Sequence, residues 1–290
     1  MTEIRLVTIP YEVGAVRMGV GNGPERLLDA GAEAVLGSRG AEVAHETVEL
    51  RDHRRDESGA SEAGAAFELI GLVAARVRQA IADGAFPVVL SGSCLAGLGV
   101  VSGLGESSPG VVWFDAHGDF NTPESTIDGY FDGMPLAILT GGAWPNLVDR
   151  VGATTVPESA VVLAGARDFD PLEERRLESS DVVQLPPGTI KADDVVARSV
   201  DEMDPAPSGL YLHVDLDVLD SEEAKVNIYS APDGLTVAEL ESQVRSLLAS
   251  RPVRAFSLTA YDPGVDAEAL VPPIAMALLQ SVADHLAESP

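Results

Sequence analysis

Six apolar runs constrain the fold more than any other feature of the sequence, because each is continuous and ends in small or polar residues. They span residues 4–10, 86–92, 110–119, 159–168, 209–220 and 254–262. Strands with one solvated face alternate apolar and polar residues, whereas parallel strands that are covered on both faces read as near-continuous apolar runs. The six runs therefore predict buried parallel strands.

Helical patterns lie between these runs. The clearest cover residues 62–84, 171–180 and 236–250. The last begins at Thr236 and has Glu239 three residues later, which is the signature of a capping box. Alternating strands and helices predict an α/β fold with a mostly parallel, doubly wound sheet and helices on both faces. No repeat or linker divides the chain, so we expect one domain over residues 1–290, with the polar segment 45–64 as a surface excursion.

The charge of the chain limits its partners. Its 46 acidic and 19 basic side chains give a formal net charge of −27, which repels nucleic acid and anionic membranes. No apolar run approaches the roughly 18 residues of a membrane span, and the first residues read as a strand rather than a signal peptide. The single cysteine, Cys94, excludes an internal disulfide and is typical of a reducing compartment. We therefore expect a cytoplasmic protein that binds neither nucleic acid nor a membrane.

Metal-ligand side chains lie at the ends of two predicted strands. The residues are Asp115, His117 and Asp119 after VVWF, and Asp215 and Asp217 within YLHVDLDVLD. Residues two apart on a strand point to the same side, so each group can converge. Buried, adjacent carboxylates are costly unless a cation neutralises them. Four carboxylates and one imidazole suit Mn²⁺ above Mg²⁺ or Zn²⁺. They exceed what one ion usually takes from a protein, so we predict two ions that share aspartates and activate a bridging water.

A structural role for these side chains is the alternative. Each aspartate taken alone fits an Asp–Arg network or an N-cap at a strand–helix turn. Taken together, the patterns DxHxD and DxD at two strand ends favour a metal centre.

At these residues the sequence resembles the arginase/agmatinase (ureohydrolase) family. The resemblance covers most of the chain and rests on the motifs IPYEVGAVRMGVGNGPERLLDAG, DAHGDFNTPEST, DGYFDGMPLA, AGARDFDPLE, HVDLDVLD with a later GLT, and SLTAYDP. It implies a three-layer α/β/α fold with a centre of two manganese ions. It also implies hydrolysis of a C–N bond in a guanidino or related group, often with release of urea. The family often forms trimers or hexamers, so a homo-oligomer is expected, although no stripe of residues marks an interface.

The resemblance assigns the metal ligands residue by residue. The family's metal motif corresponds to Asp115, His117, Asp119, Asp215 and Asp217. Its remaining ligand is a histidine in a GGDHS-like turn, which reads SGSCL here, with Cys94 in the place of the histidine. A cysteine binds metal as the thiolate, more softly than imidazole. Alternatively, Cys94 is a small buried apolar residue, and one metal site is weakened or empty. A cysteine here, with DFNTPE nearby, is similar to the N-omega-hydroxy-L-arginine amidinohydrolases of the family.

Other positions depart from the family. The histidine that shuttles protons in the family is Asp132 here, and the serine that helps to hold the substrate's carboxylate is Asp128. The glutamate that pairs with the guanidinium is Ala260. The expected substrate-binding residues are Asn121, Thr126, Asp128, Tyr130, Asp170 and Glu173.

The charges of these residues favour a cationic substrate. If the loop 120–135 overhangs the metal centre, it brings Asp128 and Asp132 there, and Asp170 adds a third carboxylate. Guanidines, hydroxyguanidines and amines fit such a site, whereas a free carboxylate near Asp128 does not. Alternatively, Asp128 only caps a turn, since Asp-Gly is a turn signal.

Three residues are candidates for catalytic proton transfer. Asp119 would orient the attacking water and pass its proton towards the leaving amine. Asp132 can replace the missing shuttle if its surroundings raise its pKa. His213 shares strand parity with Asp215 and Asp217 and can relay protons, or it is a buried structural histidine.

We therefore expect a manganese-dependent hydrolase of a C–N bond in a small, cationic, guanidino-type molecule. Two alternatives stay open. The same metal centre can act on an amide or formimino substrate, because the glutamate that pairs with the guanidinium is absent. A chain without the shuttle histidine and one histidine ligand can also be a catalytically decayed metal-binding scaffold, although the intact DAHGD and HVDLD runs count against decay.

Overall fold

An eight-stranded sheet forms the centre of the computed structural model, which describes residues 2–50, 60–105, 109–191, 194–203 and 206–288. The strand order is β4-β1-β5-β10-β9-β6-β7-β8, and every pairing in this sheet is parallel. The strands are β1 Glu3–Ile9, β4 Glu42–Thr47, β5 Phe86–Ser91, β6 Gly110–Phe114, β7 Val161–Ala164, β8 Val183–Leu185, β9 Leu210–Asp215 and β10 Val253–Thr259. A small antiparallel pair, β2 Tyr11–Glu12 and β3 Ala15–Val16, follows β1.

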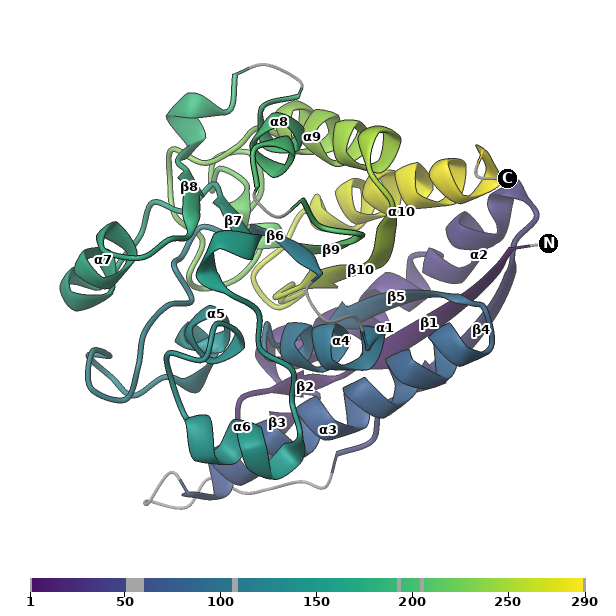
Figure 1. The fold of residues 1–290 in the computed structure, drawn as a ribbon. Helices are drawn as coiled ribbons and strands as arrows, with labels where there is room; N and C mark the ends of the chain where they lie inside the picture. Colours follow the sequence, from purple (N-terminus) through teal and green to yellow (C-terminus); the bar gives the residue numbers. More distant parts are fainter. Residues whose placement is uncertain (1, 51–59, 106–108, 192–193, 204–205, 289–290) are drawn as a thin grey trace.

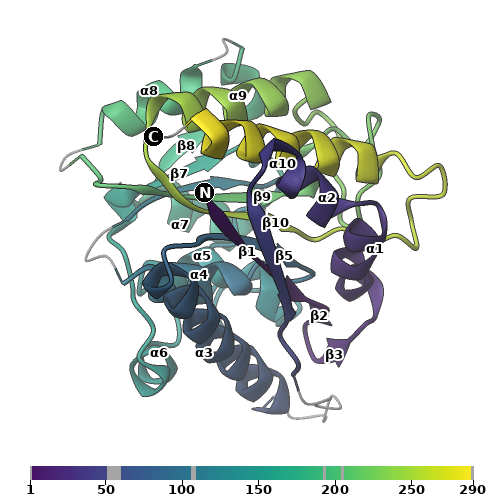
Figure 2. The ribbon, with the colours of Figure 1, turned by 90° about the vertical axis from the view of Figure 1, so that its right-hand side faces the viewer.

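Helices cover both faces of the sheet (Figures 1 and 2). The α-helices are α1 Gly23–Asp29, α2 Ala32–Leu36, α3 Ala60–Ala82, α4 Ala96–Leu104, α5 Pro135–Leu139, α6 Pro145–Val151, α7 Pro171–Glu178, α8 Val195–Asp201, α9 Val237–Ser250 and α10 Val271–Glu288. One layer holds α3, α4, α5 and α6, and the other holds α1, α2, α8, α9 and α10 (Figure 2). The predicted three-layer α/β/α fold is confirmed.

Two hydrophobic cores explain why the strand sequences are apolar without alternation. Along β6, Val111 and Trp113 pack into the core with α3 and α4, while Val112 and Phe114 pack into the core with α9 and α10. All four side chains are fully buried. Both faces of a central strand are therefore covered, as in other parallel sheets.

The sequence misplaces the segment 45–64. Its first residues belong to β4, and residues 60–64 begin α3; residues 51–59 lie outside the described part of the chain. Strand β4 is an edge strand that pairs with β1 alone. An edge strand can carry polar side chains, and Glu46 forms ion pairs with Arg5 and Arg76. Polarity therefore indicates an edge strand here rather than a loop.

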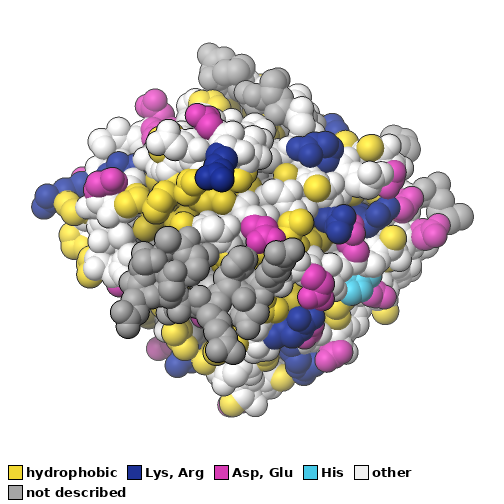
Figure 3. Space-filling view, turned by 90° about the horizontal axis from the view of Figure 1, so that it is seen from below, with side chains coloured by type: hydrophobic (Ala, Val, Ile, Leu, Met, Phe, Trp, Pro, Cys, Tyr) yellow, Lys and Arg dark blue, Asp and Glu magenta, His cyan; other side chains and the backbone are white. Residues whose placement is uncertain are grey.

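Two features bear on the surface and the helices of the protein. Within the described ranges, no helix combines the length and the apolarity that crossing a membrane requires. On the face shown in Figure 3, acidic side chains lie among basic and apolar side chains instead of forming one patch.

The capping box at the start of α9 is present and should contribute measurably to stability. Thr236 Oγ1 accepts a hydrogen bond from Glu239 N at 3.2 Å, and Glu239 Oε2 accepts one from Thr236 N at 2.9 Å. Replacing Thr236 with alanine should lower the free energy of unfolding by about 1 kcal/mol, since an N–H at the helix start loses its acceptor. Thr236→Ser keeps the acceptor and should stay close to wild type in urea denaturation. Equal losses in both variants would argue against the cap.

Candidate metal centre

The candidate site lies at the carboxyl ends of β5, β6 and β9, near the middle of the sheet. Parallel sheets bind ligands at this edge. Cys94 follows β5 in the turn before α4, Asp115 follows β6 directly, and Asp215 is the last residue of β9. These side chains line a cavity of about 470 Å³. The sheet thus brings together residues that lie about 100 positions apart in the chain.

The strand-parity argument for these residues is wrong in detail. Strand β6 ends at Phe114, so Asp115 and His117 lie beyond it, and Asp217 lies in the 3₁₀ turn Leu216–Val218 after β9. Backbone bonds turn these residues inward: His117 N donates to Asp115 Oδ1 at 2.7 Å, and Asp217 N donates to Asp215 Oδ1 at 2.8 Å. Tight turns, and not the strand pleat, bring each pair to one side.

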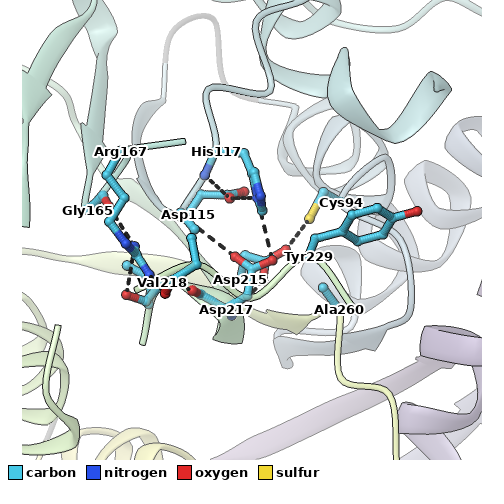
Figure 4. Close-up of polar contacts among 12 residues, drawn as sticks. Cys94, Asp115, His117, Gly165, Arg167, Asp215, Asp217, Val218, Tyr229 and Ala260 are labelled. Carbon is cyan, nitrogen blue, oxygen red and sulfur yellow. Dashed lines mark hydrogen bonds and ion pairs between the residues drawn. The ribbon is translucent and has the colours of Figure 1, made fainter. Parts of the chain in front are cut away.

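Two groups of ligand atoms converge there, each with its atoms within 4.8 Å of one another. The groups are Cys94, Asp115 and Asp215, and Asp115, His117 and Asp217. Cys94 Sγ lies 3.0 Å from Asp215 Oδ2, and His117 Nδ1 lies 3.2 Å from Asp115 Oδ1 and 3.5 Å from Asp217 Oδ2 (Figure 4). Asp115 belongs to both groups, which is the arrangement expected of a carboxylate shared between two ions.

The electrostatics of the cluster call for a cation. Asp115, Asp215 and Asp217 are only 1%, 4% and 2% exposed. Burial and the neighbouring Asp217 carboxylate raise the pKa of Asp115 and of Asp215. Burial alone would lower the pKa of His117, but Asp217 and Asp115 outweigh it and raise that pKa to about 10. The cluster therefore holds on to positive charge strongly, as expected of a cation site.

An Asp–Arg network does not account for the cluster. Within the described ranges, no arginine or lysine lies within ion-pair distance of Asp115, Asp215 or Asp217. The capping alternative accounts for part of it, because backbone N–H groups bond to one oxygen of each carboxylate. The other oxygens of Asp115 and Asp217 bond to Trp113 Nε1 and Asn227 Nδ2.

Asp119 supplies an independent sign that the site fits a metal ion. Its Oδ2 is buried without a hydrogen-bond partner, although buried carboxylate oxygens are normally paired. Its backbone has φ of +51°, a left-handed conformation that aspartate tolerates better than most residues. The residue is held there by its carbonyl, which accepts from Leu136 N at 2.9 Å and from Ala137 N at 3.1 Å. Three neighbouring carboxylates, a thiol, an imidazole and this free oxygen form a donor set that suits divalent ions.

Asp132 lines the cavity beside the turn that carries Cys94. Its Oδ1 accepts from Ser93 Oγ at 2.7 Å and from Leu95 N at 3.2 Å. Burial raises the pKa of Asp132 to about 7, against the lowering effect of these hydrogen bonds. The surroundings of Asp132 thus raise its pKa, as its expected role in proton transfer requires. One of its two oxygens, however, bonds to the turn that carries Cys94.

In the loop after Asp119, two side-chain hydrogen-bond donors bond to carboxylates of the protein itself. Asn121 Nδ2 donates to Asp170 Oδ2 at 3.1 Å, and Thr126 Oγ1 donates to Asp128 Oδ1 at 3.3 Å. Asp128 Oδ1 also accepts from Tyr130 N at 2.9 Å. Asp128 is therefore a turn residue that also lines the cavity, and its contact with a substrate stays a prediction.

Glu173 has a backbone-organising role in this loop. Its Oε1 accepts from Phe120 N at 2.9 Å, and its Oε2 accepts from Asp170 N at 3.2 Å as part of the capping box of α7. Burial raises the pKa of Glu173 to about 7. Glu173 thereby fixes the backbone next to Asp119. The rings of Tyr130 and Tyr229, which both line the cavity, pack against each other at a centroid distance of 5.4 Å.

His213 is the one predicted site residue that does not line the cavity. Its ring is fully buried and stacks on Trp113 at 3.5 Å. Its Nδ1 bonds to Tyr211 Oη at 2.9 Å and its Nε2 to Thr259 Oγ1 at 3.3 Å. Strand parity gives the correct face of the sheet but not the depth, and His213 lies one pleat further in than Asp215. The geometry favours the structural alternative for this histidine.

The sequence also missed residues that line the cavity from the loop after β9. Asn227 Nδ2 donates to Asp217 Oδ2 at 3.0 Å and to the Ala260 carbonyl at 3.0 Å. Ile228 and Tyr229 form the outer wall. No motif marks this loop, since Asn227 acts through contacts with Asp217 after β9 and with the Ala260 carbonyl after β10.

Comparisons with known proteins find relatives in sequence and in fold. The sequence model of the arginase family matches residues 2–283. An arginase of Bacillus caldovelox is 27% identical over 298 residues, which cover 97% of this chain and 98% of that protein. The crystal structure of an arginase from Bacillus subtilis strain 168 superposes with a TM-score of 0.88 at 25% identity, covering 97% of this chain and 98% of that one. A formimidoylglutamase from the same organism, at 17% identity and a TM-score of 0.76 over 100% of this chain and 88% of that one, shares the fold.

Proposed function

Because the chain belongs to the arginase family, whose members are hydrolases of C–N bonds with two metal ions, we propose that it hydrolyses a guanidino-type cation. The products would be urea, or a urea derivative, and an amine. The observation that carries the proposal is the pair of ligand groups that share the buried Asp115. Manganese is the proposed metal, because carboxylates dominate the donor set and one imidazole accompanies them.

The ligand groups suggest how two ions would be held. Cys94, Asp115 and Asp215 would hold one ion, and Asp115, His117 and Asp217 the other. Asp119, the remaining predicted ligand, belongs to neither group, and its unpaired Oδ2 is kept for the attacking water. When bound, the ions would lower the pKa of a water molecule so that it attacks the trigonal carbon at neutral pH.

Proton transfer and contacts with the substrate would be provided by side chains of the protein. Asp119 would orient the attacking water through Oδ2, accept its proton and deliver it to the leaving amine. Asp132, whose pKa burial raises to about 7, would hold or release a proton at its Oδ2 in the cavity. Asn121, Thr126, Asp128, Tyr130 and Asp170 would contact the far end of the substrate.

The lining of the cavity favours a substrate with a cationic far end. Aspartate and glutamate dominate it, and no arginine or lysine is among the described residues that line it. Two of the lining side chains that can donate to a carboxylate, Asn121 and Thr126, already donate to Asp170 and Asp128. Guanidines with a distal amine should therefore bind better than guanidino acids.

Asp128 should set this preference. Asp128→Asn keeps an acceptor for Tyr130 N but removes the charge, so kcat/KM should fall about tenfold for an amine-ended guanidine and rise for a guanidino acid. Asp128→Ser should shift the ratio in the same direction. An Asn variant that matches wild type on both substrates would show that Asp128 serves the turn alone.

A substrate screen tests the proposed function. With manganese present, urea release would be measured from arginine, hydroxyarginine, agmatine, guanidinobutyrate and guanidine, and ammonia release from formimino and amide compounds. Turnover of a guanidine supports the proposal. Turnover confined to formimino or amide compounds supports the second candidate, which Ala260 favours because it offers the cavity no carboxylate to pair with a guanidinium. Two bound ions without any turnover would support the decayed scaffold.

A further inference from the structure

Arg167 has an unusual environment that no catalytic role accounts for. It belongs to the AGARD run after β7 and is half-buried. Its guanidinium donates to six backbone carbonyls: Gly165, Asp217, Val218, Leu219, Ala231 and Pro232, at 2.7 to 3.3 Å. Among the side chains that the structure describes, no carboxylate lies within ion-pair distance of it. An arginine that binds only carbonyls acts by fixing the backbone.

The carbonyls come from three segments that meet beside the ligand clusters. Gly165 follows β7, residues 217–219 form the turn that carries Asp217, and residues 231–232 follow the cavity-lining loop 227–230. In Figure 4, Arg167 lies on the far side of Asp217 and Val218 from Cys94. Arg167 therefore joins the Asp217 turn to the loop that carries Asn227, and Asn227 in turn bonds to Asp217 Oδ2.

Gly234, from the GLT motif, leaves room for this arrangement. A Cβ added at Gly234 would lie 2.5 Å from Arg167 Nη2 and 2.6 Å from Asp220 N, closer than real Cβ contacts. The segments on either side are paired, because Leu235 N donates to the Val218 carbonyl and Asp220 N to the Leu235 carbonyl. The AGARD and GLT motifs, which supply no reacting group, thus meet at the guanidinium of Arg167.

We propose that Arg167 is a positioning residue for the metal centre, which clamps the Asp217 turn to the loop 227–232 and so assembles the ligand group of Asp115, His117 and Asp217. The inference rests on the proposed metal centre. The positive charge of Arg167 also lies near Asp217, Asp220 and Asp115, but a lysine would supply that charge equally well. The planar fork of donors, which lysine lacks, is what holds several carbonyls at once.

The test is a Mn²⁺ titration of Arg167→Lys and Gly234→Ala, followed by EPR of the bound ions, beside the thermal midpoint of the metal-free proteins. Both variants should bind the ion of the group Asp115, His117 and Asp217 at least about tenfold more weakly than wild type. They should bind the ion of the group Cys94, Asp115 and Asp215 normally. Their EPR spectra should change from that of a spin-coupled pair to that of a single ion. Arg5→Lys is the control, because Arg5 is also half-buried but pairs with Glu3 and Asp83 near the amino end of β1.

The outcomes separate this inference from the proposed function. Unchanged affinities for both ions in both variants would overturn it, even if the midpoint of the metal-free protein fell, because that would be a structural role only. If Arg167→Lys does not fold, the titration of Gly234→Ala decides by the same criterion. A wild-type protein that binds fewer than two ions would contradict the proposed metal centre itself, and the inference with it.

Discussion

Replacing Asp115 with asparagine should abolish detectable hydrolysis and weaken the binding of both ions by on the order of a hundredfold or more. Asp115 is the only residue that both ligand groups contain. Its Oδ1 accepts from His117 N and its Oδ2 from Trp113 Nε1, so an amide would place its NH₂ group against another donor. The measurement is metal content after dialysis against manganese, together with turnover on the best substrate.

The thermal stability of the same variant separates metal loss from misfolding. Burial and Asp217 raise the pKa of the Asp115 carboxyl, so the ionised form costs stability in the metal-free protein. Metal-free Asp115→Asn is relieved of this cost but sets an NH₂ group against a donor, so the decisive comparison is the gain in stability on adding manganese, which only wild type should show. Asp168→Asn, which removes a carboxylate from the same cavity outside both ligand groups, should still respond to manganese. An equal gain in Asp115→Asn would contradict the shared role.

Replacing Asp119 with asparagine should lower kcat by about two to four orders of magnitude, the range for a lost general base. Asparagine adopts the left-handed backbone conformation as readily as aspartate, so the φ of +51° at this position should be kept. The change removes a group that can accept a proton at the oxygen with no partner in the protein. Stopped-flow or steady-state turnover would measure the loss.

The control for Asp119 is the fold and the metal content of the same variant. Because burial and the Asp115 carboxylate raise the pKa of Asp119, neutralising it should not destabilise the metal-free protein. At least one ion should stay bound through Asp115 and its partners. Activity near that of wild type would remove Asp119 from the proton path, whereas loss of both ions would make it a ligand first.

The fold was predictable because it depends on local patterns. Continuous apolar runs such as 110–119, whose beginning forms β6, mark strands that are covered on both faces, and Thr236 with Glu239 marks a helix start. The short edge strands β4 and β8 were not predicted, because an edge strand is paired on one side only and carries polar residues. Their composition overlaps with that of loops.

The candidate site was predictable where ligands cluster in the sequence. Asp115, His117 and Asp119 lie within five residues. Burying such a group is costly unless a cation neutralises its charge. Arg167 and Asn227 act through contacts with turns that are distant in the sequence, so no spacing identifies them. His213 was placed on the correct face of the sheet, but parity does not tell a residue at the end of a strand from one a pleat further in.

The number of ions bound per chain tests the central claim most directly. Purified protein would be stripped of metal, titrated with Mn²⁺ and examined by EPR and elemental analysis. Two ions per chain with a spin-coupled signal are predicted, because two ligand groups meet at Asp115. No bound manganese, or one ion that Asp115→Asn does not displace, would contradict the account.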